Sequence, residues 1–162
     1  MPSEAPLGGV RVLDFTRLLP GPVCTLYLAD LGADVVKIED TGAGDYARTL
    51  GAGDAGAPSA FYRNVNRGKR SLALDLKSLR GRECAEALAA RADVVVESFR
   101  PGVMAAPPLD HATLRARHPR LVYVSISGYG QTGPRAAMAG HDVNYLGYAG
   151  VLDQTGSAGG PP

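Results

Sequence analysis

One histidine has a position suited to acid–base chemistry. His141 lies in the sequence Gly-His-Asp-Val-Asn-Tyr (140–145), after a glycine-rich loop at residues 128–134. Neutral imidazole has a reference pKa of about 6.5, so it can exchange protons near neutral pH. Tyr145 stands four residues later, where a helical two-histidine metal motif would need a second histidine, and no metal site is predicted. From these residues alone, a catalytic and a structural histidine are equally well supported.

Three cations occur within four residues. Arg67, Lys69 and Arg70 surround Gly68 and precede an apolar segment. Such a cluster can bind the phosphates of a nucleotide-bearing ligand such as CoA. The alternative is a solvated basic loop, which is the commoner explanation for a short run of cations.

Two apparent nucleotide motifs fail on their context. Residues 42–47 match the G-x-G-x-x-A dinucleotide pattern, but the following residues, including Gly51-Ala52-Gly53, do not predict the required helix. The P-loop pattern needs a serine or threonine where Arg70 stands and a glycine where Arg63 stands. Neither motif is therefore assigned.

The cysteines indicate packing rather than nucleophilic chemistry. Cys24 lies near the start of a predicted helix, where a thiolate would be stabilised, but no histidine is close in sequence. We interpret Cys24 as a small buried apolar residue. Cys84 is the only other cysteine, and the pair has no zinc-like spacing. Two lone thiols favour a reducing, cytoplasmic setting.

The elements that must position these residues alternate between strand and helix. Short, continuous apolar runs suit parallel strands that are covered on both faces. The alternation predicts an α/β fold with a Rossmann-like, open and mostly parallel sheet. The expected strands are Val10–Phe15, Asp34–Ile38, Ser71–Leu76, Asp93–Glu97 and Leu121–Ile126.

Two helices connect the early strands. The first is expected to start at Pro20, where a missing N–H is tolerated, and to stop at Gly32. The second begins at Ser78, and its apolar face is predicted to contain three residues at helical spacing. These are Cys84, Ala87 and Leu88.

Two other segments are expected at the surface. Residues 41–60 contain many glycines and alanines and predict a long exposed loop. His111 and His118 flank a polar helical stretch, Ala112–Arg117, and are interpreted as surface residues.

Composition limits the classes of function. The 162 residues carry a net charge of +1, with 45% hydrophobic and 20% charged residues, which is typical of a globular domain. The charge balance gives no reason to expect nucleic acid as a partner, and no apolar run is long enough to cross a membrane. No secretory signal is predicted at residues 1–9. The glycine-rich end at residues 156–162 predicts that more protein follows.

Several of these segments together resemble the family III CoA-transferases and α-methylacyl-CoA racemases. The match covers almost the whole chain, in the order and spacing of that superfamily. It is carried by Val10–Asp14 with Pro20–Pro22, Ala29–Glu39, Arg67–Leu76, Glu97–Val103, and Gly128–Pro134 continuing to Gly140–Tyr145.

The resemblance implies a fold and an assembly. Residues 1–162 would form an incomplete, CoA-binding, Rossmann-like large domain, and the rest of that domain and a small second domain would be absent. The complete protein would be an interlocked homodimer. Its substrate would be a CoA thioester, with no permanently bound cofactor.

The resemblance also implies site residues. His141 matches the catalytic base of the racemases. Other positions match stretches that line the acyl-CoA site or lie near the CoA phosphates. These are Lys37, Arg67, Lys69, Arg70, Ala73, Leu74, Asp75, Leu76, Arg100, Gly140, Asp142, Asn144 and Tyr145. Asp40 stands where racemases commonly have an arginine, and this departure favours transferase-like contacts on the adenine side.

Three functions remain open from the sequence. The leading interpretation is a racemase, in which two acid–base groups flank the carbon next to the thioester. The second is a CoA-transferase that works through an aspartyl anhydride. Both need an aspartate that the resemblance places beyond Pro162. The third is an inactive CoA-binding fragment, or one chain of a split enzyme. Asp142 is expected to cap the helix that follows His141 rather than to carry protons.

Overall fold

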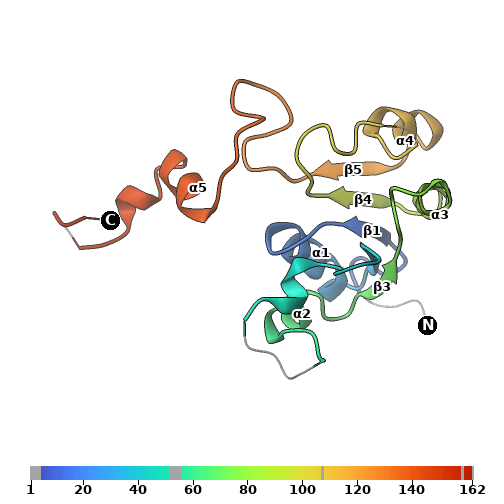
Figure 1. Ribbon diagram of the computed structural model, residues 1–162, viewed down its shortest axis with the longest axis horizontal. Helices are drawn as coiled ribbons and strands as arrows, with labels where there is room; N and C mark the ends of the chain where they lie inside the picture. Colours follow the sequence, from blue (N-terminus) through green and yellow to red (C-terminus); the bar gives the residue numbers. More distant parts are fainter. Residues whose placement is uncertain (1–4, 52–55, 107, 158, 162) are drawn as a thin grey trace. The chain divides into compact units, whose positions relative to one another are not determined.

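The computed structural model describes residues 5–51, 56–106, 108–157 and 159–161. The chain forms two compact units, Met1–Ile126 and Ser127–Pro162 (Figure 1). Each unit is described by itself.

The first unit contains a five-stranded parallel sheet with the order β3-β2-β1-β4-β5. Every neighbouring pair of strands is parallel, and β1 lies at the centre. This confirms the predicted α/β fold. The strands are β1 (Arg11–Phe15), β2 (Asp34–Glu39), β3 (Arg70–Ala73), β4 (Val94–Glu97) and β5 (Val122–Ser125).

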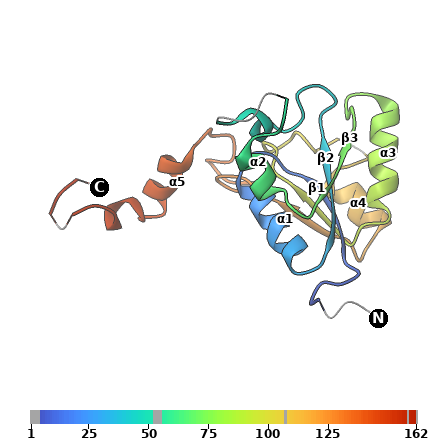
Figure 2. The same cartoon turned by 90° about the horizontal axis from the view of Figure 1, so that it is seen from below.

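Helices cover both faces of this sheet, and α1 (Pro20–Asp30) and α3 (Leu79–Ala89) lie on opposite sides of it (Figure 2). Side chains alternate along β1, so Val12 packs in the cluster beside α1. Leu13 and Phe15 pack in the cluster that contains residues of α3 and α4 (His111–Arg117). The central strand β1 therefore needs apolar side chains on both faces of the sheet.

Helix α1 starts at Pro20 as predicted, and Gly32 follows its end with a φ of 98°. The predicted apolar face of α3 is wrong at two of its three positions, and only Leu88 packs partly against the core. Its buried residues are Gly81, Ala85 and Ala89, whereas Cys84 and Ala87 are exposed. A Cβ at Gly81 would overlap the carbonyl oxygen of Asp75, so the first turn of α3 lies directly against the loop that precedes it.

The segment 41–60 has more structure than predicted. A 3₁₀ helix, η1 (Tyr46–Thr49), is capped by the Asp45 carboxylate, and α2 (Ala60–Val65) is capped by Ser59. The prediction missed both because short polar caps in glycine-rich sequence resemble turns. Part of that expected loop, 52–55, lies outside the described residues.

The second unit contains α5 (Asp142–Tyr148) and a 3₁₀ helix, η2 (Leu152–Gln154). Neither helix has a buried residue within this chain. In the described part of the chain, no helix is long and apolar enough to span a bilayer.

Candidate functional site

The strand order has a topological switch point between β1 and β4. The chain passes from β1 to β2 on one side, and β4 later pairs with the other side of β1. Ligands of open α/β sheets bind outside the carboxyl ends of strands at such a switch point. The residues that leave β1 and β4 here are Thr16–Leu18 and Ser98–Phe99.

Arg17 connects the two strand ends. Its backbone N–H donates to Ser98 Oγ at 3.1 Å. Its guanidinium carbon lies 5.2 Å from the Phe99 ring centroid and 5.6 Å from that of Tyr46. Arg17 was not among the site residues predicted from the sequence. Its position two residues after a buried strand could have indicated it, because ligand contacts concentrate at such strand ends.

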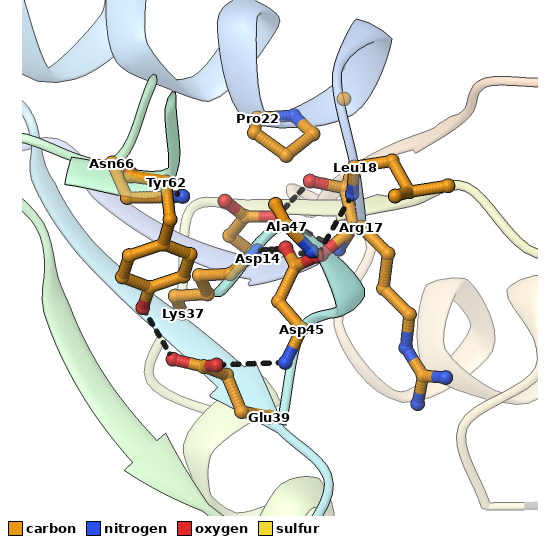
Figure 3. A network of polar contacts seen from close by, with 12 residues as sticks. Asp14, Arg17, Leu18, Pro22, Lys37, Glu39, Asp45, Ala47, Tyr62 and Asn66 are labelled. Atoms are coloured by element: carbon orange, nitrogen blue, oxygen red, sulfur yellow. Dashed lines mark hydrogen bonds and ion pairs between the residues drawn. The ribbon is translucent and has the colours of Figure 1, made fainter. Parts of the chain in front are cut away.

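The next residue has a strained backbone. Leu18 has a φ of 65°, which is uncommon for a residue with a side chain and costs free energy. The Asp45 carboxylate helps to hold the turn, because its Oδ1 accepts the Leu18 N–H at 3.1 Å and the Ala47 N–H at 2.9 Å (Figure 3).

Lys37 also stabilises this turn, through Asp45 and the Thr16 carbonyl. Its Nζ lies 2.8 Å from Asp45 Oδ2 and donates to the Thr16 carbonyl at 2.7 Å. Both charged side chains are buried, with exposed fractions of 1% and 0%. The ammonium of Lys37 therefore has partners within the protein. Its contact with CoA stays a prediction, and the burial of this side chain does not favour it.

Glu39 is the centre of a second polar cluster. Arg48 donates to both of its oxygens at 2.7 and 2.8 Å, and the Tyr62 hydroxyl and Ser71 hydroxyl each donate at 2.6 Å. Burial disfavours the carboxylate, but these bonds and the Asp45 N–H outweigh it and hold the pKa of Glu39 well below its usual range. Burial, followed by the bond to Glu39, raises the pKa of Tyr62.

Lys69 is also inside the protein. Its Nζ donates to Thr25 Oγ1 and the Pro22 carbonyl, each at 2.8 Å, and lies 3.3 Å from the buried Asp14 carboxylate. Burial lowers the pKa of Lys69, against the attraction of Asp14. The side chain is 1% exposed, so it connects β1 and α1 to the loop before β3.

The other two cations of the basic loop already have carboxylate partners. Arg67 pairs with Asp30 at 2.5 Å, and Arg70 pairs with Asp34 through bonds of 3.0 and 2.6 Å. These exposed pairs contribute little to stability, but they neutralise the charges that were assigned to CoA phosphates. Phosphate binding by this loop stays a prediction and would require these pairs to open.

The segment after β3 runs along the sheet edge. Ala73 is exposed, whereas Leu74 and Leu76 pack partly against the larger core cluster. The Asp75 carboxylate accepts the Lys77 N–H at 2.9 Å and so shapes the turn into α3. Arg100 follows β4 and is exposed.

His141 lies at the N-cap of α5, and Asp142 is the first helical residue. The predicted N-cap at Asp142 is therefore wrong by one position. The His141 N–H donates to Asn144 Oδ1 at 2.9 Å, and the Tyr145 hydroxyl donates to the Gly140 carbonyl at 2.7 Å. These two bonds fix the backbone on both sides of an exposed imidazole.

Aromatic rings brace this turn within the second unit. The Tyr129 ring contacts those of Tyr145 and Tyr148 edge-on, with centroids 5.3 and 5.6 Å apart. Arg135 lies 4.0 Å from the Tyr148 centroid. Tyr145 is so close to Gly128 that a Cβ there would overlap its ring, which explains this glycine. Among the residues whose positions are described, no three His, Cys, Asp or Glu side chains gather to hold a metal ion.

Comparisons with known proteins agree with the superfamily resemblance. The family model described as CoA-transferase family III matches residues 7–162. Human succinyl-CoA:glutarate CoA-transferase is 43% identical over 162 residues, covering 100% of this chain and 37% of the human protein. Mouse α-methylacyl-CoA racemase is 42% identical over 156 residues, covering 96% of this chain and 37% of the mouse protein.

A solved structure shares the architecture. A CaiB/BaiF family protein from Brucella suis superposes with a TM-score of 0.90 at 41% identity, covering 98% of this chain and 43% of that protein. The chain thus spans about two fifths of the length of these relatives.

Proposed function

This chain belongs to CoA-transferase family III, and we propose that the whole protein transfers CoA between an acyl-CoA and a carboxylic acid. In such a reaction the thioester bond of the donor breaks and a new thioester forms on the acceptor. The donor acyl group leaves as a carboxylate, so no oxidant or reductant is needed. The observation that carries the proposal is the match of this chain, over all of its 162 residues, to 37% of a succinyl-CoA:glutarate CoA-transferase.

This proposal reverses the order of the two enzyme activities that the sequence favoured. The racemase interpretation relied on His141, but relatives named for succinate–glutarate CoA transfer in human and Agrobacterium match the chain at 43% and 41% identity. These matches favour CoA transfer over racemisation for the whole protein.

The proposal places the thioester at the switch point between β1 and β4. The Arg17–Leu18 turn there is held by Ser98 and Asp45. A turn held by buried partners can present its backbone groups to a ligand without reorganising.

The test uses the full-length protein with succinyl-CoA and a panel of carboxylic acids. We expect a new acyl-CoA to appear, detected by liquid chromatography and mass spectrometry, with release of an equal amount of succinate. Absence of transfer to every acid, in a protein that still binds CoA, would contradict the proposal.

A racemase remains the second candidate, because His141 is exposed at a braced helix start and the mouse racemase is 42% identical. The test is deuterium incorporation at the α-carbon of a 2-methylacyl-CoA in heavy water. Exchange without movement of CoA to an acid would establish racemisation instead of transfer.

The third candidate is a CoA-binding chain without its own activity. We expect residues 1–162 alone to be inactive, and turnover by this chain alone would rule the idea out. We also propose that CoA thioester is a substrate rather than a bound cofactor, and that the protein is a cytoplasmic, interlocked homodimer. Size measurement in solution tests the dimer.

A further inference from the structure

We propose that Arg17 binds the free carboxylate of a dicarboxylic acyl group at the switch point between β1 and β4. The proposal rests on the CoA-transferase function proposed above. It names the class of substrate for that site: an acyl-CoA whose acyl chain ends in a second carboxylate.

The guanidinium of Arg17 has no carboxylate partner among the described residues. Five other arginines in the first unit do pair with carboxylates, and these are Arg11, Arg48, Arg67, Arg70 and Arg117. Two carboxylates near this turn already have cationic partners. Asp45 pairs with Lys37, and Glu39 pairs with Arg48. In Figure 3 the Arg17 side chain extends away from Asp45 and Glu39.

The nearest acid on β4 is occupied too. Glu97 is 4% exposed, and its Oε2 accepts the Phe99 N–H at 2.8 Å. It therefore stabilises the loop after β4 rather than neutralising Arg17.

The Arg17 side chain is nevertheless held in place. The ring centroids of Phe99 and Tyr46 lie 5.2 and 5.6 Å from the guanidinium carbon; Phe99 lies in the loop after β4 and Tyr46 begins η1. Contact with a ring uses the flat face of a guanidinium and leaves its in-plane N–H donors free. The backbone is fixed by Ser98 on one side and by the Leu18–Asp45 bond on the other. A partly buried, oriented and unpaired fork of donors is suited to a planar carboxylate.

The chemistry of the proposed reaction supplies such a carboxylate. In the name of the human relative, both the acyl donor and the acceptor are dicarboxylic. One carboxyl group forms the thioester, and the other stays charged and needs a cation when it leaves water. A CoA phosphate would offer a similar anion, so the experiment must separate the two sources.

The test compares two donors in the full-length enzyme. Succinyl-CoA and butyryl-CoA have acyl chains of equal carbon number, but only succinyl-CoA has the second carboxylate. We expect Arg17→Met to lower kcat/KM for succinyl-CoA by about 10- to 100-fold, with a change for butyryl-CoA below about threefold. Arg17→Lys should restore part of the loss, because it keeps the charge but not the fork.

Arg91→Met is the matched control. Arg91 is exposed and lies between α3 and the amino end of β4, whereas Arg17 follows the carboxyl end of β1. We expect its preference between the two donors to equal that of the wild type. If Arg17→Met does not fold, the test is the ratio of kcat/KM for succinyl-CoA and butyryl-CoA in the wild-type enzyme. A ratio near one overturns the proposal.

The remaining outcomes are also decisive. Equal losses for both donors, with weaker binding of free CoA, would assign Arg17 to a phosphate and overturn the proposal. An unchanged donor preference in Arg17→Met would overturn the role of Arg17 while leaving CoA transfer intact. A wild-type enzyme that moves CoA from neither donor would instead refute the proposed function, and this inference would fall with it.

Discussion

At the scale of single residues, three ion pairs of the first unit bury all or most of their charge: Lys37–Asp45, Lys69–Asp14 and Arg48–Glu39. Lys69–Asp14 joins segments 55 residues apart, whereas the other two connect β2 to the segment that follows it. A buried charge that loses its partner is strongly destabilising, so these pairs constrain the ends of β1 and β2.

Glu39→Gln should destabilise the intact protein by about 3 kcal/mol, because its buried carboxylate accepts hydrogen bonds from Arg48 and Tyr62 that an amide cannot all retain. Urea unfolding measures the change. Glu83→Gln, on the exposed face of α3, is the control and should change the free energy of unfolding by less than about 0.5 kcal/mol. Equal effects of the two substitutions would contradict a structural role for Glu39.

The same residue makes stability depend on pH in a defined direction. The pKa of Glu39 is lowered in the folded protein from an ordinary value of 4.5. Its contribution is therefore fully present above that value and is lost as pH falls below it toward the folded pKa. We expect the difference in unfolding free energy between wild type and Glu39→Gln to shrink as the pH falls from about 5 to about 3. A difference that is constant with pH would refute this linkage.

At the scale of elements, close backbone contact rather than hydrophobic pattern orients α3. Gly81 occupies its first turn, directly against the Asp75 carbonyl, and Ser78 Oγ accepts the Gly81 N–H at 3.0 Å. The small face of the helix is buried as a result, and Cys84 faces solvent.

Gly81→Ala should therefore destabilise the protein by about 1–3 kcal/mol, although alanine favours helix more than glycine does. Ala87→Gly, at an exposed position of the same helix, is the matched control and should cost about 1 kcal/mol through helix propensity alone. Thermal or chemical unfolding of both variants tests the argument. Stabilisation by Gly81→Ala would show that α3 does not lie this close to the loop before it.

At the scale of the whole molecule, the two units differ in how much of each is buried. Leu13 on β1 and Val95 on β4 are 3% and 0% exposed, whereas α5 has no buried residue in this chain. Resistance to local opening follows buried packing and paired backbone.

Hydrogen exchange of the 162-residue chain should reflect this contrast. We expect amides of β1 and β4 to exchange about a thousandfold or more slowly than those of α5. Mass spectrometry of peptides after timed exchange measures the ratio. Similar rates in both units would mean that α5 is stabilised by more than its own helix contacts.

The sequence alone determined the class of fold and the superfamily. Strands that are covered on both faces need mainly apolar residues, so segments such as Val10–Phe15 can be recognised without coordinates. Helix ends at Pro20 and Gly32 were equally readable, because both residues restrict the backbone locally. The face of α3 and the caps of η1 and α5 were not readable, since each depends on a contact or on a shift of one residue.

Only the tertiary structure decided which charges are free to meet a ligand. Lys37, Lys69 and Arg70 look like available cations in the sequence, but each has a carboxylate partner that the fold brings from another segment. Arg17 belongs to no distinctive motif. At the switch point, it has no carboxylate partner among the described residues. Charge pairing acts over a few ångströms in space, and chain order does not specify which strand ends become neighbours until the sheet has formed.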